Sequence, residues 1–328
     1  MGIFAAQEQD KLTAKMSNFN LHILGCGSAK PTLRHNPTCQ VVEHNGNLYM
    51  VDCGEGAQTM MARMHLRMSR LQHIFISHLH GDHCFGLPGL VSTMALHGKG
   101  GSITIHIFKD GAELFGNMFR YFVRDIPMQI NFDIIEYGNH VIYEDSVLKI
   151  STIPLKHRVP TVGFLFEEKP KLRHINGEMA KFHQVPLYMM NSIREGADFV
   201  KPDGTVVANS ILTTAPTPSV RYAYCSDTMP ASKIAPVVEG VDWMYHEATY
   251  ANDNIRAARE RFHSTAEQAA TLARDANVGN LIIGHYSSRY DDETVLLSEA
   301  RSVYPRTILA DEGMHIDLLK GFDAQNLR

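Results

Sequence analysis

The run Ser77-His-Leu-His-Gly-Asp-His83 decides how the chain is interpreted. The apolar run His73–Ser77 before it is typical of a strand, and Gly86-Leu-Pro-Gly89 after it can begin a helix. A loop between a strand and a helix aims several side chains at one point, while the flanking elements hold it rigid. This loop carries four metal-capable side chains within six residues: His78, His80, Asp82 and His83.

The ligand types favour zinc, because imidazole and carboxylate are present without thiolate, although manganese and iron also bind these groups. One tetrahedral ion uses at most three or four of the ligands, and adjacent side chains point in different directions. Two ions are therefore easier to satisfy than one. Further ligands are expected at the ends of later strands, and four apolar runs each end in a candidate: His157, Asp227, His246 and His285.

This pattern resembles the metallo-β-lactamase superfamily and, more narrowly, ribonuclease Z, the endonuclease that trims the 3′ ends of tRNA. The resemblance extends from about Leu21 to Ile316. The HxHxDH run alone marks the superfamily and leaves the substrate open. Segments later in the chain are more specific to ribonuclease Z, and they are Ser226-Asp-Thr228, His246-Glu-Ala-Thr249, His263-Ser-Thr265 and Gly284-His-Tyr-Ser-Ser-Arg-Tyr290.

The resemblance implies two zinc ions per chain with one shared carboxylate. Zinc ions roughly 3.5–4 Å apart lower the pKa of bound water from about 15.7 towards 7, so hydroxide becomes available at neutral pH. The ligands implied for the first ion are His78, His80, His157 and Asp227. Those implied for the second ion are Asp82, His83, His285 and the bridging Asp227.

The resemblance also implies catalytic roles. Asp82 would be the general base, and His246 and His263 would meet the scissile phosphate and help protonate the leaving 3′ oxygen. Glu247 would orient His246. The expected reaction is zinc-dependent cleavage of precursor tRNA, with a 3′-hydroxyl left on the tRNA and a 5′-phosphate left on the trailer.

Several of these residues also have structural interpretations. Ser264 can begin the helix expected at Thr265–Asn277, so the His263-Ser-Thr265 segment has a structural use in any case. A structural role for Glu247 is weighed equally with its functional one. Asp52 and Glu55 are expected to form a loop or to contact the ligands from outside.

The rest of the chain predicts an α/β protein. Short apolar runs alternate with helical stretches, which indicates helices packed on mixed sheets. The resemblance makes this the four-layer αβ/βα metallo-β-lactamase fold, as one domain over residues 17–328 after a leader, residues 1–16, that is expected to be disordered. Strands are expected at Phe19–Leu24, Leu48–Val51, Ile103–Phe108, Gln129–Glu136, Val147–Pro154, Thr161–Phe166, Val220–Cys225, Trp243–His246 and Leu281–Gly284.

Residues 167–219 interrupt this pattern with five prolines and few periodic apolar positions. An insertion of this length is usually functional or disordered. The resemblance assigns it to an arm that grips tRNA, and it suggests a homodimer in which the arm of one subunit serves the active site of the other. The tip, Val185-Pro-Leu-Tyr-Met-Met-Asn191, lacks the Gly-Pro and Lys character of the family's arm.

A second departure lies in the segment Pro31-Thr-Leu-Arg-His-Asn36. Bacterial ribonuclease Z proteins resemble one another at a Pro-x-Lys-x-Arg-Asn loop that manages the 3′ end of the substrate. Leu33 stands in the place of the Lys, and His35 stands in the place of the Arg. The resemblance therefore leaves open how a CCA end is handled.

The amino-acid composition and net charge limit the class of protein. Of 328 residues, 44% are hydrophobic and 20% are charged, which suits a globular protein with a large core. No apolar run approaches the roughly 18 residues of a membrane span, and no signal peptide is evident. Five widely spaced cysteines without a CxxC pair fit a reducing cytoplasm. The net charge of −4 counts mildly against nucleic acid as a partner.

Other functions stay open. A small-molecule phosphodiesterase or lactonase of the same superfamily would share the HxHxDH run, but the later segments speak against it. A di-iron redox protein usually carries Glu at the position of His80. A non-enzymatic RNA-binding module with a structural metal is disfavoured, because structural zinc sites are closed.

Overall fold

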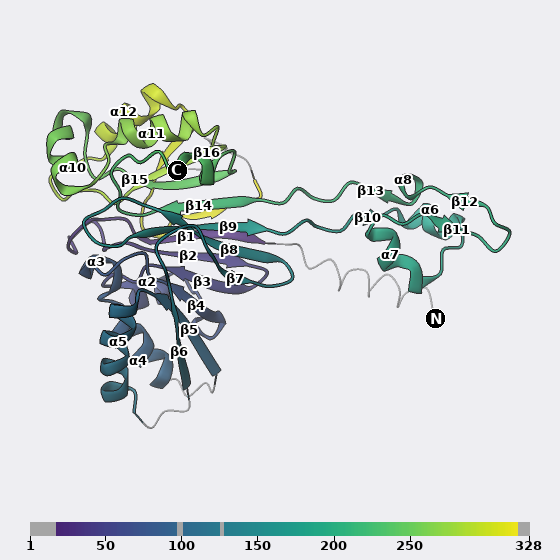
Figure 1. Ribbon diagram of the computed structural model, residues 1–328, viewed down its shortest axis with the longest axis horizontal. Helices are drawn as coiled ribbons and strands as arrows, with labels where there is room; N and C mark the ends of the chain where they lie inside the picture. The colour runs from purple at the N-terminus through teal and green to yellow at the C-terminus, as the bar shows by residue number, and fades with distance from the viewer. Residues whose placement is uncertain (1–17, 97–100, 125–127, 321–328) are drawn as a thin grey trace.

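Two seven-stranded sheets face each other in the computed structural model of the chain, which describes residues 18–96, 101–124 and 128–320. Helices cover the outer face of each sheet, so the molecule has four layers (Figure 1). The α/β layering predicted from the sequence is confirmed. The leader expected at residues 1–16 lies outside the described residues. No helix in the described part of the chain is long and apolar enough to cross a membrane.

The first sheet has the strand order β18-β1-β2-β3-β4-β5-β6. Its neighbours are antiparallel from β18 to β3 and parallel from β3 to β6. The strands are β1 (Phe19–Gly25), β2 (Cys39–His44), β3 (Asn47–Val51), β4 (Leu71–Phe75), β5 (Gly101–Ile107), β6 (Met128–Ile134) and β18 (His315–Asp317). The helices of this half are α2 (Ala57–Arg63), η1 (Met68–Arg70), α3 (Gly81–Cys84), α4 (Leu87–Leu96) and α5 (Lys109–Phe122).

The second sheet has the order β17-β16-β15-β14-β9-β8-β7. It is parallel from β17 to β14 and antiparallel from β14 to β7. The strands are β7 (Val141–Glu144), β8 (Leu148–Pro154), β9 (Val162–Glu168), β14 (Arg221–Cys225), β15 (Trp243–Glu247), β16 (Asn280–Gly284) and β17 (Thr307–Leu309). The helices of this half are α9 (Ala235–Val238), η3 (Asn252–Asn254), α10 (Ile255–Arg261), α11 (Ala266–Asp275) and α12 (Thr294–Val303).

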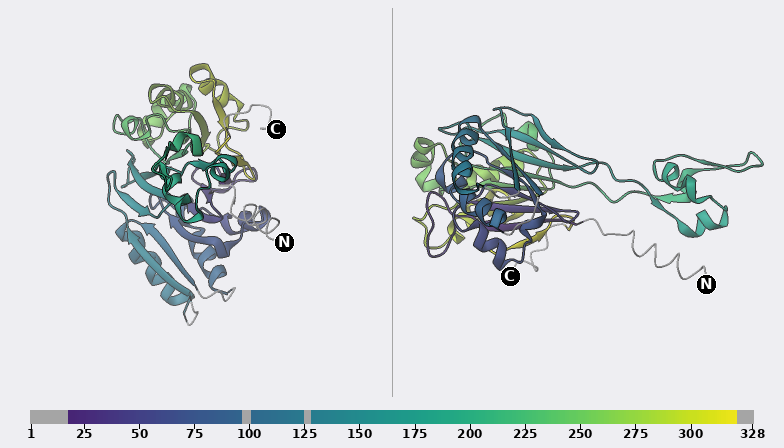
Figure 2. Two further views of the ribbon diagram at one scale, coloured as in Figure 1. Left: turned by 90° about the vertical axis from the view of Figure 1, so that its right-hand side faces the viewer. Right: turned by 90° about the horizontal axis from the view of Figure 1, so that it is seen from below.

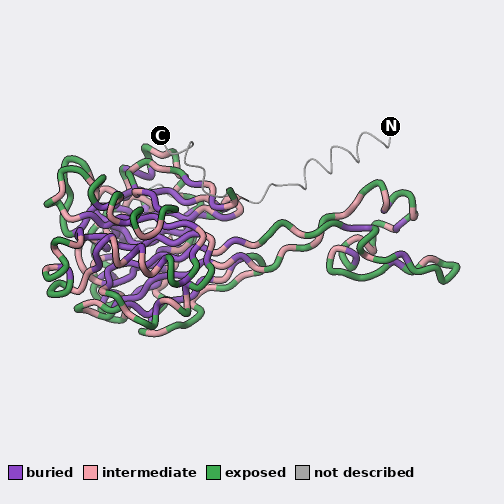
Figure 3. The backbone as a smooth tube through the Cα atoms, turned by 90° about the horizontal axis from the view of Figure 1, so that it is seen from above, coloured by how far each residue is buried: buried purple, intermediate pink, exposed green. Residues whose placement is uncertain are grey.

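Alternation along the strands separates two hydrophobic clusters. Successive side chains of a strand point to opposite faces. In β3, Tyr49 and Val51 pack into the cluster between the sheets, whereas Leu48 and Met50 pack under α2 and α4. Figure 3 shows buried residues concentrated in the sandwich. Burial on both faces thus fixes the register of each strand.

The strand directions bring the candidate ligands to one edge. The chain reaches His78 after β4, His157 after β8, Asp227 after β14 and His285 directly after β16. Strand β9 runs antiparallel to both β8 and β14. Its last residue, Glu168, therefore lies at the sheet edge opposite these ligands.

The chain between β9 and β14 extends away from the sandwich as two limbs that end in a small unit (Figures 1 and 2). The unit has its own hydrophobic cluster, which includes Ile193, Phe199 and Leu212. We call the segment from Lys169 to Ser219 the arm. Its elements are β10 (His174–Ile175), α6 (Gly177–Phe182), η2 (Leu187–Met189), α7 (Met190–Arg194), β11 (Phe199–Val200), β12 (Val206–Val207), α8 (Asn209–Leu212) and β13 (Thr213–Thr214).

Candidate metal centre and active site

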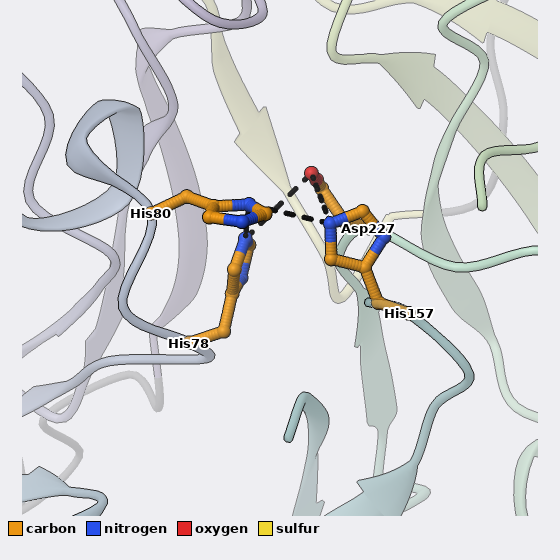
Figure 4. A group of neighbouring side chains, drawn as sticks. All are labelled: His78, His80, His157 and Asp227. Atoms are coloured by element: carbon orange, nitrogen blue, oxygen red, sulfur yellow. Dashed lines mark hydrogen bonds and ion pairs between the residues drawn. The ribbon is translucent and has the colours of Figure 1, made fainter. Parts of the chain in front are cut away.

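Four ligand atoms from three loops converge in a first cluster (Figure 4). The Nδ1 atom of His80 lies 3.0 Å from Nε2 of His78 and 3.3 Å from Nε2 of His157. Asp227 closes the cluster, with its Oδ2 atom 3.7 Å from His78 Nε2 and 3.8 Å from His157 Nε2. Four nitrogen and oxygen atoms around one point match the ligand number of a tetrahedral ion.

A second cluster lies beside the first and is formed by Asp82, His83 and His285. The Oδ2 atom of Asp82 is 3.7 Å from His83 Nε2 and 3.5 Å from His285 Nε2. The Oδ1 atom of Asp227 is 3.3 Å from His83 Nε2 and 3.2 Å from His285 Nε2. The two oxygens of Asp227 thus face different clusters, as a bridging carboxylate requires.

The buried atoms of the second cluster fit a metal ion. His83 Nε2, His285 Nε2 and Asp227 Oδ1 have no hydrogen-bond partner among the described residues. Leaving a buried polar atom unpaired costs about 1–3 kcal/mol, and one cation would satisfy all three atoms. Burial lowers the pKa of His83, but Asp227, Asp52 and Asp82 outweigh it and raise that pKa well above its usual value. The cluster therefore attracts positive charge.

The first cluster also suits a metal ion, because its histidines favour the neutral form. Burial is the main cause that lowers the pKa of His78 and His157, and the neighbouring imidazoles lower it further. A neutral imidazole keeps the lone pair that a metal needs. Asp227 is held in its charged form, because His285 and His83 outweigh its burial and keep its pKa well below the usual value.

The other ring nitrogen of four of these histidines is held by a hydrogen bond. Such outer contacts fix the tautomer and the orientation of a ligand. The imidazole N–H donates to an oxygen in each pair, and the pairs are His78 Nδ1 with Ser77 Oγ (3.0 Å), His83 Nδ1 with Asp52 Oδ2 (2.8 Å), His157 Nδ1 with the Phe262 carbonyl (2.9 Å) and His285 Nδ1 with Thr249 Oγ1 (2.9 Å).

Asp52 is fully buried and accepts several hydrogen bonds from the residues around the metal ligands. Besides His83, its carboxylate accepts from the Ser77 amide (2.8 Å), the Ser77 hydroxyl (2.9 Å) and the Tyr224 hydroxyl (2.6 Å). It thereby joins the end of β3, the HxHxDH loop and strand β14. The sequence placed Asp52 in a loop or outer role, but its position at the end of an apolar strand did not reveal this many partners.

The carboxylate of Glu247 contacts His263 rather than His246, which corrects the pairing expected from the sequence. Its Oε1 atom lies 2.8 Å from His263 Nδ1, and its Oε2 atom accepts from the Thr249 hydroxyl at 2.6 Å. The pair reaches the metal clusters, because His263 Nδ1 is 3.9 Å from Asp227 Oδ2. Burial lowers the pKa of His263, but Glu247 outweighs it and raises that pKa to about 9.

His246 does not lie with the other candidates, and the structure does not bring it to the metal clusters as the sequence led us to expect. It is the residue before Glu247 in β15, and neighbours on a strand face opposite sides of the sheet. Its side chain is 2% exposed, and its Nδ1 atom donates to the backbone carbonyl of Glu247 at 2.7 Å. No contact in the described part of the chain joins it to a metal cluster.

The segment from Ala29 to His35 lies beside the second cluster. The Ala29 amide donates to Asp82 Oδ2 at 2.6 Å. His35 bridges Glu312 (2.8 Å) and Glu293 (3.2 Å), so the residue that stands in the place of an expected Arg still carries ion pairs. Leu33 is fully exposed.

Thr249 links the Glu247–His263 pair to the ligand His285, which gives a first testable prediction. Thr249→Val removes the acceptor of His285 Nδ1 with little change in side-chain volume. Loss of such an outer contact costs roughly 10–100-fold in metal affinity, and we expect a loss of that size in a chelator competition assay. Thr249→Ser, which keeps the hydroxyl, should bind metal like the wild type. Equal affinity of the valine and serine variants would remove Thr249 from this role.

The fold and the two clusters define a protein of metallo-β-lactamase fold. Ribonuclease Z of Parabacteroides distasonis is 50% identical over 92% of this chain and 100% of its own length. Ribonuclease Z of Bacteroides thetaiotaomicron is 49% identical over 92% of this chain and 96% of its own length. The chain therefore belongs to the ribonuclease Z family, and the resemblance stated from the sequence is confirmed.

Solved structures support the same fold. Human tRNase Z, short form, matches with a TM-score of 0.66 at 21% identity, over 91% of this chain and 99% of that chain. The metallo-β-lactamase fold protein YhfI from Bacillus subtilis matches with a TM-score of 0.65 at 14% identity, over the same shares. A family model described as anti-Pycsar protein Apyc1 matches residues 19–169.

Proposed function

We propose that this chain is a zinc-dependent endoribonuclease that cleaves precursor tRNA at its 3′ side. It leaves a 3′-hydroxyl on the tRNA and a 5′-phosphate on the trailer. The observation that carries the proposal is the pair of ligand clusters that share Asp227, in a chain of the ribonuclease Z family. The same chemistry needs no 2′-hydroxyl, so small phosphodiesters would be cut as well.

Two zinc ions would be held by seven residues. His78, His80 and His157 would hold the first ion with Oδ2 of Asp227, and their outer contacts would fix the ring orientations. The ions supply the nucleophile when bound, because they lower the pKa of water from about 15.7 towards 7. The ligands of the second ion would be Asp82, His83, His285 and Oδ1 of Asp227.

Asp82 would orient the attacking water and accept its proton. Burial raises the pKa of Asp82, but His83 and His285 outweigh it and hold that pKa well below the usual range. The carboxylate is therefore ionised at neutral pH. The Ala29 amide, which donates to the same Oδ2 atom, fixes the direction of the carboxylate.

His263 would protonate the leaving 3′ oxygen. With a pKa raised to about 9, its imidazole carries a proton at neutral pH. Glu247 holds Nδ1, which leaves Nε2 to donate to the substrate. As water attacks phosphorus, the bond from phosphorus to the 3′ oxygen breaks and that oxygen takes the proton from His263. Glu247 positions the ring and keeps it charged.

A comparison of substrates distinguishes the proposed function from the main alternative, a small-molecule phosphodiesterase or lactonase. Zinc-loaded protein is incubated with precursor tRNA, bis(p-nitrophenyl) phosphate, a cyclic nucleotide and a lactone. The proposal expects the highest kcat/KM for precursor tRNA, because only that substrate reaches beyond the metal centre. A higher kcat/KM for a cyclic nucleotide or a lactone would favour the alternative.

The arm begins far from the metal ligands of its own subunit, and this distance is the reason to propose a homodimer. The seven residues of β9 span roughly 23 Å at about 3.3 Å per residue, and the arm begins at the end far from the ligands. In Figure 1, α3 and α10 lie on the side opposite the arm. We therefore propose that the arm binds tRNA whose 3′ end enters the site of a second subunit.

We also place the enzyme in the cytoplasm, in keeping with its five unpaired cysteines.

Removal of the arm gives the second prediction. The limbs meet at the root, where the Ser219 hydroxyl donates to the Lys169 carbonyl at 2.9 Å, so a short Gly-Ser linker can replace residues 170–218. The variant should cut bis(p-nitrophenyl) phosphate like the wild type. Its KM for precursor tRNA should rise at least about tenfold, which corresponds to about 1.4 kcal/mol of lost binding. An unchanged KM for precursor tRNA would show that the arm does not hold tRNA.

A further inference from the structure

A pocket of about 400 Å³ opens beside His263, outside the metal clusters. This volume lies within the usual range for small-ligand sites and is large enough for one nucleotide. The pocket is formed by the segment after Asp227, by helix α10 and by the start of helix α11. The lining residues that matter here are Met229, Pro230, Ile255, Arg256, Arg259 and His263.

The wall formed by α10 is basic. Arg256 and Arg259 stand three residues apart and therefore project from the same face of the helix. Both are exposed, and neither guanidinium has an ion-pair or hydrogen-bond partner within the described residues. Arg158 adds a third cation near this helix, because it donates to the Glu260 carbonyl at 2.9 Å. This is a positive surface in a chain whose net charge is −4.

The pocket also has apolar lining residues. Ile255 is 43% exposed at the start of α10, and Met229, in the segment after Asp227, is half-buried. Exposed apolar side chains next to free guanidinium groups suit a ligand with one flat apolar part and one phosphate. A nucleotide has both parts, since its base can pack on aliphatic side chains while Arg binds its phosphate.

His263 determines which nucleotide of the substrate reaches this pocket. The proposed reaction transfers a proton from His263 to the 3′ oxygen, and this oxygen belongs to the nucleotide on the 5′ side of the cut. An in-line displacement places the attacking water on the other side of phosphorus. Asp82, which accepts from the Ala29 amide, is the residue proposed to hold that water. The nucleotide that keeps the 3′ oxygen must therefore extend towards the wall that His263 shares with Arg256 and Arg259.

From this we infer that the pocket is the subsite for the last nucleotide retained on the tRNA, with Arg256 and Arg259 bound to the phosphate on its 5′ side. The inference rests on the proposed function and adds the direction in which the RNA strand crosses the site. Ile255 and Met229 pack on the base without reading its edge, so the subsite accepts any of the four bases.

The test combines protein variants with a substrate that lacks one charge. A neutral methylphosphonate replaces the phosphate on the 5′ side of the last retained nucleotide. In the wild type this replacement should lower kcat/KM about tenfold. In the double variant Arg256→Ala, Arg259→Ala the same replacement should have little further effect, because the two changes remove one interaction. Arg261→Ala, on the same helix but outside the pocket, is the matched control and should respond like the wild type.

Zinc content and Tm of each variant show that it is folded. If the methylphosphonate costs the double variant as much as it costs the wild type, the subsite is wrongly placed. If the larger and coupled loss arises from a methylphosphonate one linkage into the trailer, the strand direction is reversed and the inference is overturned. If the wild type cleaves no precursor tRNA, the proposed function fails, and the inference falls with it.

Discussion

Replacing Asp227 with alanine is expected to release both metal ions. Its Oδ2 atom faces His78 and His157, and its Oδ1 atom faces His83 and His285, so one substitution removes a ligand from each ion. The five buried or half-buried ligand histidines would then be left with Asp82 as their remaining carboxylate ligand. Elemental analysis should fall from about two zinc ions per chain to less than one.

Cleavage should fall together with the metal. The loss of a shared ligand should exceed the roughly 10–100-fold that the loss of an outer contact costs, so we expect cleavage of precursor tRNA to drop to the level measured with a chelator. Asp253→Ala, an exposed position close to the site in sequence, is the control and should keep both ions. Two tightly held ions in the Asp227→Ala protein would remove Asp227 from the bridging position.

Replacing His263 with alanine is expected to remove chemistry while leaving the metal in place. A general acid typically contributes about 10²–10⁴-fold, so kcat on precursor tRNA should fall by that factor. The loss should be much smaller on bis(p-nitrophenyl) phosphate, because a nitrophenolate leaves without a proton. Equal losses on the two substrates would assign His263 to metal binding or to structure.

A substitution of Glu247 tests the same role of His263 through the pH dependence of the cleavage rate. Glu247 raises the pKa of His263, so its removal lets burial lower that pKa. A general acid works below its own pKa, and activity is lost as pH rises through it. Glu247→Gln should therefore move the falling limb of the pH–rate profile to lower pH. An unmoved limb would mean that His263 is not the acid.

The sequence was most informative where chemistry follows a strand. His157, Asp227 and His285 each come after a buried apolar run, and such runs can be recognised by composition alone. The prediction that Glu247 orients His246 was wrong for a physical reason. Family motifs name residues but not the face of the strand on which each lies, and His246 and Glu247 point to opposite faces.

Some elements of the fold carried a signal that the sequence interpretation did not use. Helix α5 buries Phe115 and Phe119, which stand four residues apart as an amphipathic helix requires. Strand β2 was not expected, because Cys39–His44 is buried on both faces and shows no alternation. The elements of the arm are mostly two to six residues long, too short for any periodicity to define them.

His35 illustrates a limit of motif comparison. As a departure from the family loop, it raised a question about CCA ends, but a motif does not show what the new residue contacts. In the fold, His35 lies between Glu293 and Glu312 and ties the loop that carries Ala29 to the C-terminal part of the chain. The loop is therefore braced by a different residue type.

The two ligand clusters are proposed to cut precursor tRNA. The most direct measurement is to incubate the zinc-loaded protein with a precursor tRNA that carries a 3′ trailer and to sequence both product ends. We expect one cut, with a 3′-hydroxyl on the tRNA and a 5′-phosphate on the trailer, and no cut in the presence of a chelator. An intact precursor, a 2′,3′-cyclic phosphate at the cut, or cleavage that persists with the chelator would contradict it.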